Sequence, residues 1–172
     1  MGLLTNHTFN DLNDLFVHEL KDLYDAEYRI TEALPKMAAA ASSPELKRAF
    51  ETHLMETQNH ITRLEQVFRQ IGCDADRETC PAMQGIIKEG SEMISANGDP
   101  DTRDAALIAS AQRVEHYEMA GYGTLRTFAM ELNKPAIAQL LQQTLDEEGK
   151  TDKLLTQIAE SRVNQKAKQM HA

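Results

Sequence analysis

Apolar residues recur every three or four positions along four long stretches of the chain, a spacing that predicts amphipathic helices. In the first stretch the apolar seam consists of Phe16, Leu20, Leu23, Ile30, Leu34 and Met37. A fifth, shorter stretch contains two glycines and predicts a weaker helix. The helices are therefore predicted at residues 9–41, 44–72, 82–95, 101–132 and 135–163.

Residues that start or end helices mark the breaks between these stretches. Ser42 or Ser43 can cap the second helix, and Pro44 suits its first turn, where the missing N–H has no partner to lose. Gly72 is suited to end that helix. Residues 73–100 then form one long connection, whereas the other two turns are short. Two tight hairpins joined by one long crossover predict an all-α, ferritin-like antiparallel four-helix bundle whose crossover carries a short fifth helix.

Acidic residues interrupt the apolar seam of each long helix near its middle. Extending the first seam predicts an apolar residue near position 27, where the chain has Glu27. The gaps in the four helices hold Glu27, His53, Glu56, Glu115, Glu118, Glu148 and Asp152. Glu27 and Glu56 lie about equally far from the first turn, and the acids of the second hairpin are placed similarly about Asn133. We therefore expect the acids to be level within each hairpin, and we assume that the two hairpins match in height.

Carboxylates buried together lose hydration and repel one another, so they need protons, basic partners or a cation. A pair of divalent metal ions meets this need, and ferritin-like bundles hold such a pair with inward glutamates and histidines. For any one acid alone, a solvent-facing position or a pairing with Lys or Arg is the simpler interpretation. The coincidence in all four helices favours a metal or proton-sharing site. We expect His60 and His116 to flank it and Glu147 to face solvent.

Composition narrows the classes of function. The 172 residues, of which 41% are hydrophobic and 26% charged, predict a single domain spanning residues 1–172. A net charge of −9 argues against a nucleic-acid partner. Because no apolar stretch reaches the roughly 18 residues of a membrane span, we expect no membrane partner and a cytoplasmic location. Cys73 and Cys80 match neither a redox pair nor a zinc site and are expected to be free thiols.

Four segments resemble the YciF-type bacterial stress proteins, a ferritin-like family related to rubrerythrin and manganese catalase. They are DLYDAE (22–27), HLMET (53–57), DAALIASAQRVEHYEMAGYGTL (104–125) and TLDEEGKTDKLL (144–155). The similarity extends over about residues 10–165. It implies a homodimeric four-helix bundle that is associated with the stress response and with a metal site.

The resemblance also implies roles for individual acids. Glu115-x-x-Glu118 is similar to the paired acids on the third helix of rubrerythrin. Glu27 is similar to the acid of its first helix, and Glu148 to the acid of its last helix. In this comparison Glu115 or Glu118 would bridge two metal ions.

The second and fourth helices depart from the rubrerythrin pattern, in which a glutamate is followed three residues later by a histidine. The second helix has the reverse order, His53-x-x-Glu56, and the fourth has Thr151 or Asp152 where a histidine would stand. His53 would then be a terminal ligand and Asp152 a ligand or a nearby acceptor. With at most one imidazole, the predicted site is rich in oxygen ligands. Iron or manganese is the expected divalent metal pair, and magnesium or calcium would compete for it.

Two functions of different classes follow from these observations. The first is a ferritin-like stress protein with a carboxylate-rich di-metal site that handles iron, or oxygen or peroxide as a small-molecule substrate. The second is a metal-free helical homodimer that acts as a structural or interaction protein and keeps its inward acids protonated. The metal content of protein purified without a chelator distinguishes the two.

Overall fold

The computed structural model describes residues 7–169, and all regular structure in this range is helical. The elements are α1 (Leu12–Ala40), α2 (Pro44–Ile71), α3 (Pro81–Ile94), α4 (Pro100–Glu131), α5 (Pro135–Ile158), the π-helix η1 (Ala159–Val163) and α6 (Asn164–Gln169). The bounds differ from the predicted ones mainly at two ends. α1 begins at Leu12, not at residue 9, and the last predicted helix is interrupted at Ala159 by η1.

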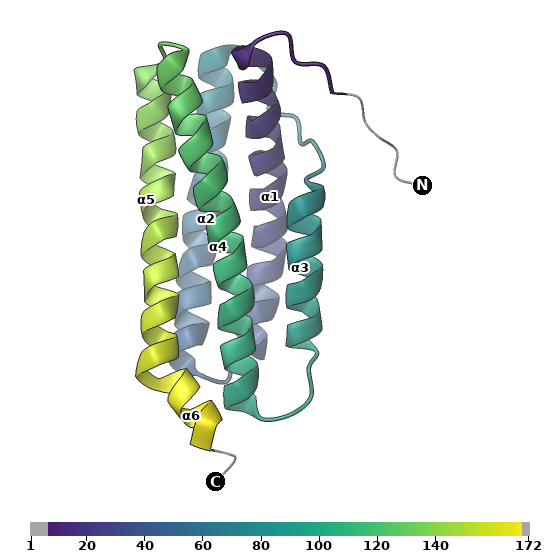
Figure 1. Ribbon diagram of the computed structural model, residues 1–172, viewed down its shortest axis with the longest axis vertical. Coiled ribbons are helices and arrows are strands. Elements are labelled where there is room, and N and C mark those ends of the chain that lie inside the picture. Colours follow the sequence, from purple (N-terminus) through teal and green to yellow (C-terminus); the bar gives the residue numbers. More distant parts are fainter. Residues whose placement is uncertain (1–6, 170–172) are drawn as a thin grey trace.

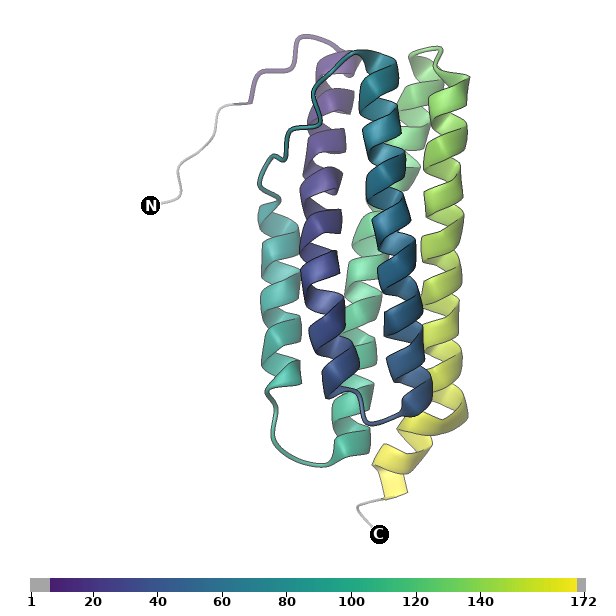
Figure 2. The same ribbon diagram turned by 180° about the vertical axis from the view of Figure 1, so that it is seen from behind.

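The four long helices α1, α2, α4 and α5 lie side by side as an antiparallel bundle (Figure 1). α1 packs mainly against α2 and α4 mainly against α5, while α2 contacts α5 and α1 contacts α4 across the bundle. α3 lies outside this bundle, against α1 and α4, on the long crossover that connects the two hairpins (Figure 2). The predicted architecture, an all-α bundle with one crossover and a short additional helix, is confirmed.

Side chains that satisfy free backbone groups set the ends of the helices. Ser43 is the N-cap of α2, and Gly72 ends that helix with a φ of 71°, in the left-handed region that glycine adopts without strain. The buried Asp104 of α4 accepts hydrogen bonds from the N–H groups of Ser42 (2.8 Å) and Ser43 (2.6 Å). This contact fastens the α1–α2 turn to α4. No helix within residues 7–169 has an apolar stretch long enough to cross a membrane.

Two apolar clusters fill the bundle, one toward each end. The first includes Ile30, Phe50, Ala111 and Leu155, and the second includes Tyr24, Ile61, Tyr122 and Leu141. In each long helix the buried glutamates and histidines lie between a residue of the first cluster and a residue of the second. A polar layer therefore separates the two clusters, and it places the acids of both hairpins at the same height.

Candidate metal centre

Buried glutamate and histidine side chains from all four long helices converge in the polar layer. They form two groups that share one residue: His53, Glu115, Glu118 and Glu148 in the first group, and Glu27, His60 and Glu148 in the second. Within each group the potential ligand atoms all lie within 4.8 Å of one another. None of these six residues is more than 2% exposed. The structure thus brings together Glu27, His53, Glu115, Glu118 and Glu148 of the residues predicted from sequence.

His53 presents one ring nitrogen to the centre and the other to an outer acid. Its Nε2 lies 3.3 Å from Oε1 of Glu115 and 3.7 Å from Oε2 of Glu148. Its Nδ1 lies 3.6 Å from Oε2 of Glu56, whose side chain is 26% exposed. Glu56 was predicted as a ligand, but it belongs to neither group and stands behind His53, where it can orient the ring.

His60 lies inside the site, although we expected it to flank the ligands. Its Nδ1 is 2.9 Å from Oε1 of Glu148 and 3.5 Å from Oε1 of Glu27. Its Nε2 is 2.8 Å from Oε2 of Glu147, which also accepts hydrogen bonds from Arg63 at 3.0 and 3.2 Å. Glu147 therefore bridges His60 to Arg63 and does not simply face solvent. His60 follows His53 by seven residues, which is two helical turns. This spacing places both histidines on the same face of α2 and could have identified His60 from the sequence.

Many polar atoms of the centre have no hydrogen-bond partner among the described residues. These atoms are Oε2 of Glu27, Nε2 of His53, Nδ1 of His60, Oε2 of Glu115, and both carboxylate oxygens of Glu118 and of Glu148. Of these atoms, Nδ1 of His60 and Oε1 of Glu148 approach each other to 2.9 Å as an ion pair. Tyr122 donates to Oε1 of Glu27 and so supports one acid from the side. Buried polar atoms are normally paired, so this concentration of unpaired atoms distinguishes the centre from the rest of the core.

Burial and mutual charge shift the pKa values of the groups in the centre. Burial, reinforced by the charge of Glu148, raises the pKa of Glu115 and of Glu118 well above the ordinary glutamate value. Burial would lower the pKa of His60, but its contacts with Glu148 and Glu27 outweigh burial and raise that pKa to about 10. Burial would raise the pKa of Glu148, but His60 and His53 outweigh it and lower that pKa. The raised pKa values of Glu115, Glu118 and His60 therefore all favour the protonated forms of these groups.

Asp152, the other predicted ligand, lies outside both groups. Its Oδ1 accepts a hydrogen bond from Gln112 at 3.0 Å and lies 3.4 Å from Nε2 of the exposed His116. Thr151, one residue earlier, is buried and its hydroxyl is 3.4 Å from Nδ1 of His53. On α5, therefore, Thr151 and not Asp152 faces the centre.

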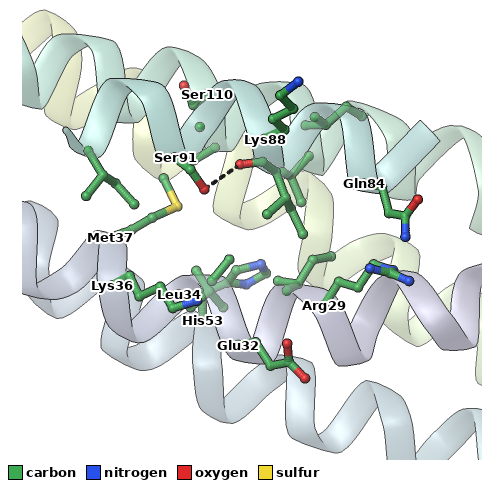
Figure 3. Close-up of a pocket in the computed structure, with 18 of the residues that line it drawn as sticks. Arg29, Glu32, Leu34, Lys36, Met37, His53, Gln84, Lys88, Ser91 and Ser110 are labelled. Carbon is green, nitrogen blue, oxygen red and sulfur yellow. Dashed lines mark hydrogen bonds between the residues drawn. The ribbon is translucent and has the colours of Figure 1, made fainter. Parts of the chain in front are cut away.

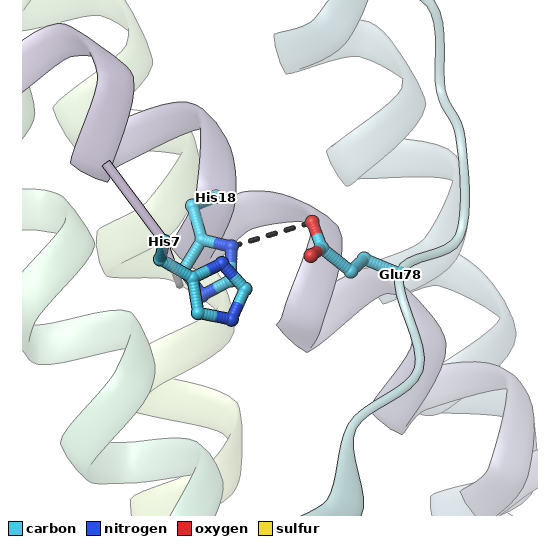
Figure 4. Close-up of side chains that lie close together, drawn as sticks. All are labelled: His7, His18 and Glu78. Atoms are coloured by element: carbon cyan, nitrogen blue, oxygen red, sulfur yellow. Dashed lines mark hydrogen bonds and ion pairs between the residues drawn. The ribbon is translucent and has the colours of Figure 1, made fainter. Parts of the chain in front are cut away.

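A third group of potential ligands lies on the surface and was not predicted from the sequence. His7 precedes α1, His18 belongs to α1, and Glu78 belongs to the crossover before α3 (Figure 4). Nδ1 of His18 lies 3.3 Å from Oε2 of Glu78, and their side chains are 24% and 42% exposed. Since water can solvate these groups, nothing in their surroundings demands an ion. The cluster could still take up metal in solution, and measurements on the buried centre need to account for it.

Comparison with known proteins finds one matching family and a similar curated protein. The profile of the DUF892 family, described as a domain of unknown function, matches residues 11–168. Protein YciF of Escherichia coli strain K12 is 46% identical over 157 residues, which cover 91% of this chain and 95% of YciF. The crystal structure of the E. coli stress protein YciF superposes with a TM-score of 0.87 at 45% identity, covering 91% of this chain and 99% of that one.

Two other solved structures extend the comparison. YcfI of Rhodopseudomonas palustris, described as a candidate structural protein, is similar with a TM-score of 0.84 at 41% identity, over 90% of this chain and 98% of that one. A two-domain protein of Anabaena variabilis with a ferritin-like domain matches with a TM-score of 0.59 at 19% identity, over 90% of this chain and 38% of its own. The last similarity shows the fold alone.

Proposed function

The chain belongs to the DUF892 family, and we propose that it is a ferritin-like stress protein that binds a pair of divalent metal ions in its bundle core. The unpaired polar atoms of the buried centre carry this proposal. Left without a partner, each such atom would destabilise the fold by about 1–3 kcal/mol, and more if it were charged. Two ions would pair these atoms at once.

The donor set fits iron or manganese. Glu27 and His60 would hold one ion, and His53, Glu115 and Glu118 the other, with Glu148 shared between them. Two imidazoles and four carboxylates combine nitrogen and oxygen donors, and imidazole favours transition metals over magnesium or calcium. When bound, iron or manganese would supply redox chemistry toward oxygen or peroxide.

The protein's own residues prepare the donors for this role. The outer acids Glu56 and Glu147 each stand behind one imidazole and leave its other nitrogen directed at the centre. Such a carboxylate–histidine arrangement selects the ring tautomer and makes the inward nitrogen a better ligand. Tyr122 holds Glu27 by its hydroxyl. The apolar clusters above and below the layer limit the access of water from the two ends of the bundle.

Metal stoichiometry tests the proposal. All proteins would carry His18→Ala, which removes a ligand of the surface cluster, and would be purified without chelator. Elemental analysis and anaerobic titration with Fe²⁺ or Mn²⁺ should give about two ions per chain. Glu148→Gln removes the residue that both groups share and should abolish binding of the pair. Glu51→Gln changes an exposed acid on α2 and serves as the matched control, with unchanged stoichiometry.

A parent protein that binds no metal, or a Glu148→Gln variant that still binds two ions, would contradict the metal site. If metal is bound, peroxide consumption and oxygen-dependent oxidation of Fe²⁺ distinguish an enzyme from a store.

A metal-free homodimer with a structural role is the second candidate. Two features favour it: the raised pKa values of Glu115, Glu118 and His60, which favour protonated side chains in the centre, and the description of the similar YcfI. In that case the parent and Glu148→Gln proteins would contain no metal and have equal thermal stability with and without added Mn²⁺. Light scattering coupled to size exclusion would measure the proposed dimer directly.

A further inference from the structure

A cavity of about 240 Å³ lies between α1, α3 and α4 and reaches the candidate metal centre. Its inner end includes His53 and Glu115, which are both 2% exposed. Two exposed residues, Lys36 and Lys88, also line the cavity (Figure 3). The cavity thus connects the surface with two of the buried donor residues.

Apolar side chains from three helices form most of the cavity wall. They are Ile30, Leu34 and Met37 of α1, Ile87 and Ile94 of α3, and Val114 of α4. An apolar cavity of ~150 Å³ can stay dry and hold benzene, so a cavity of about 240 Å³ has room for a larger apolar body. At the inner end, Nε2 of His53 and Oε2 of Glu115 are among the atoms without a hydrogen-bond partner. A molecule in the cavity would therefore lie next to the centre.

The mouth of the cavity is basic, in contrast to the protein as a whole. Arg29, Lys36 and Lys88 line it against one acid, Glu32. Arg29 is already paired with Asp25 at 2.5 Å, whereas Lys36 and Lys88 are exposed to solvent and lie on opposite walls, in α1 and α3. Because the chain has a net charge of −9, this local excess of positive charge selects for an anion at the mouth.

We infer that the cavity binds a small amphipathic carboxylic acid, with its carboxylate between Lys36 and Lys88 and its apolar body directed toward His53 and Glu115. The opposite orientation would take the carboxylate out of water, past the apolar walls, and would leave the apolar body among the exposed lysines. Contact between the apolar part of this ligand and a bound metal ion would depend on the proposed function. Binding itself depends only on the cavity and the two lysines.

Calorimetric titration of the metal-free protein in chelator tests the inference. The probes are decanoate and decanol, which share an apolar chain and differ in charge. Decanoate should bind with a stoichiometry of one and at least about tenfold more tightly than decanol. The double variant Lys36→Glu, Lys88→Glu should lower decanoate affinity at least about tenfold and change decanol affinity less than about twofold. Both lysines are exposed, so the variant should fold normally.

Two further variants separate specific binding from general effects. Lys153→Glu, Lys168→Glu changes the net charge equally at exposed positions away from the cavity and should bind decanoate like the parent. Val114→Phe fills the cavity and should weaken both probes, with circular dichroism as the check on folding. If Val114→Phe fails to fold, the lysine pairs still decide the question. Equal losses in the two lysine pairs, equal affinity for both probes, or no binding of decanoate would overturn the inference.

The two proposals can fail independently. Decanoate binding in chelator without any metal uptake would leave the cavity as a ligand site and remove the metal centre. Two bound metal ions without decanoate binding would leave the metal centre and remove the carboxylic acid. With both present, decanoate should change the electron paramagnetic resonance spectrum of the Mn²⁺-loaded protein, and decanoate added to the Lys36→Glu, Lys88→Glu variant should change it much less.

Discussion

Asp25 and Glu27 lie two residues apart on α1, and both are buried, yet their surroundings are opposite. Asp25 faces the crossover, where it accepts hydrogen bonds from Arg29 (2.5 Å), Arg77 (2.9 Å) and the N–H of Cys80 (2.9 Å). Glu27 faces the bundle centre, where Tyr122 donates to one carboxylate oxygen and the other has no partner among the described residues. One helix thus carries a fully paired acid and an incompletely paired one.

Burial acts on both acids, and the difference in partners decides their pKa values. Burial would raise the pKa of Asp25, but the Cys80 N–H and the two arginines outweigh it and lower that pKa. For Glu27 burial prevails and raises the pKa, although His60 and Tyr122 oppose it. Asp25, which links α1 to the crossover, is thus fully paired by side chains and backbone of the same protein. Most carboxylate oxygens of the centre lack such partners and remain available to a ligand.

Removing the charge of Asp25 should have the largest effect on stability. Asp25→Asn leaves Arg29 and Arg77 without their shared carboxylate, and breaking a buried ion pair from one side destabilises a protein by about 3 kcal/mol. Because Cys80 is the N-cap of α3, the loss should also loosen α3. Urea denaturation would measure the change, and hydrogen exchange would locate it. Equal exchange rates in α3 of the variant and the parent would contradict this role for Asp25.

The pH dependence of the metal-free protein should follow the centre and not Asp25. Glu115 and Glu118 have raised pKa values, so above about pH 4.5 the folded state holds more protons than the unfolded state. The free energy of unfolding should then fall as pH rises, by about 1.4 kcal/mol per pH unit for each excess proton. His60 acts in the same direction because its pKa is raised from 6.5 to about 10. The stability that protonated His60 gives the folded state is fully present below pH 6.5 and is lost as the pH rises toward about 10. Asp25, with a lowered pKa, contributes above its ordinary value of 3.8 and loses its contribution only as pH falls further.

Denaturation in chelator between about pH 6 and 9 would measure this slope. Saturating Mn²⁺ should reverse it, because metal binding requires ionised carboxylates and neutral imidazoles and so tightens as pH rises. A metal-free stability that is constant over this range would show that the acids of the centre are neutralised in another way.

Glu118→Gln should affect stability in the direction opposite to Asp25→Asn. Neither oxygen of Glu118 has a partner among the described residues, so an uncharged amide of the same shape removes repulsion without breaking a hydrogen bond. We expect the metal-free variant to gain about 1 kcal/mol at pH 8, because burial disfavours the ionised carboxylate there. The same variant should lose most of the stabilisation that added Mn²⁺ gives the parent. Thermal unfolding with and without Mn²⁺ checks both, and a destabilised metal-free variant would contradict the comparison with Asp25.

Most of the fold could be predicted from the sequence because the apolar seams are long and their breaks carry capping residues. The two disagreements have local causes. Asp11 caps α1 by accepting from the N–H of Asp14 at 2.9 Å, which delays the helix start beyond the expected residue 9. The π-helix at 159–163 contains neither proline nor glycine. Its wider turn, with hydrogen bonds from residue i to i+5, is too short to change the three-to-four residue spacing of the apolar residues.

The centre could be predicted in part because a charged residue within an apolar seam is conspicuous. Glu27, Glu115, Glu118 and Glu148 all lie in seams, and the structure brings them together. Choosing between neighbours is harder, since one residue along a helix rotates the side chain by about 100°. His60 was assigned to the flank because a histidine is compatible with either a core or a surface face.

The smallest effects are expected for the two acids that the sequence suggested as ligands and that the structure places outside both groups. Glu56→Gln should lower metal affinity about tenfold, because Glu56 orients His53 through Nδ1 without joining the donor set. Asp152→Asn should change the affinity by less than about twofold, since its side chain is engaged with Gln112. Competition titration with a chelating dye, in the His18→Ala background, would rank Glu148→Gln, Glu56→Gln and Asp152→Asn in that order of effect. A loss for Asp152→Asn as large as for Glu148→Gln would instead place Asp152 among the ligands and require α5 to turn when metal binds.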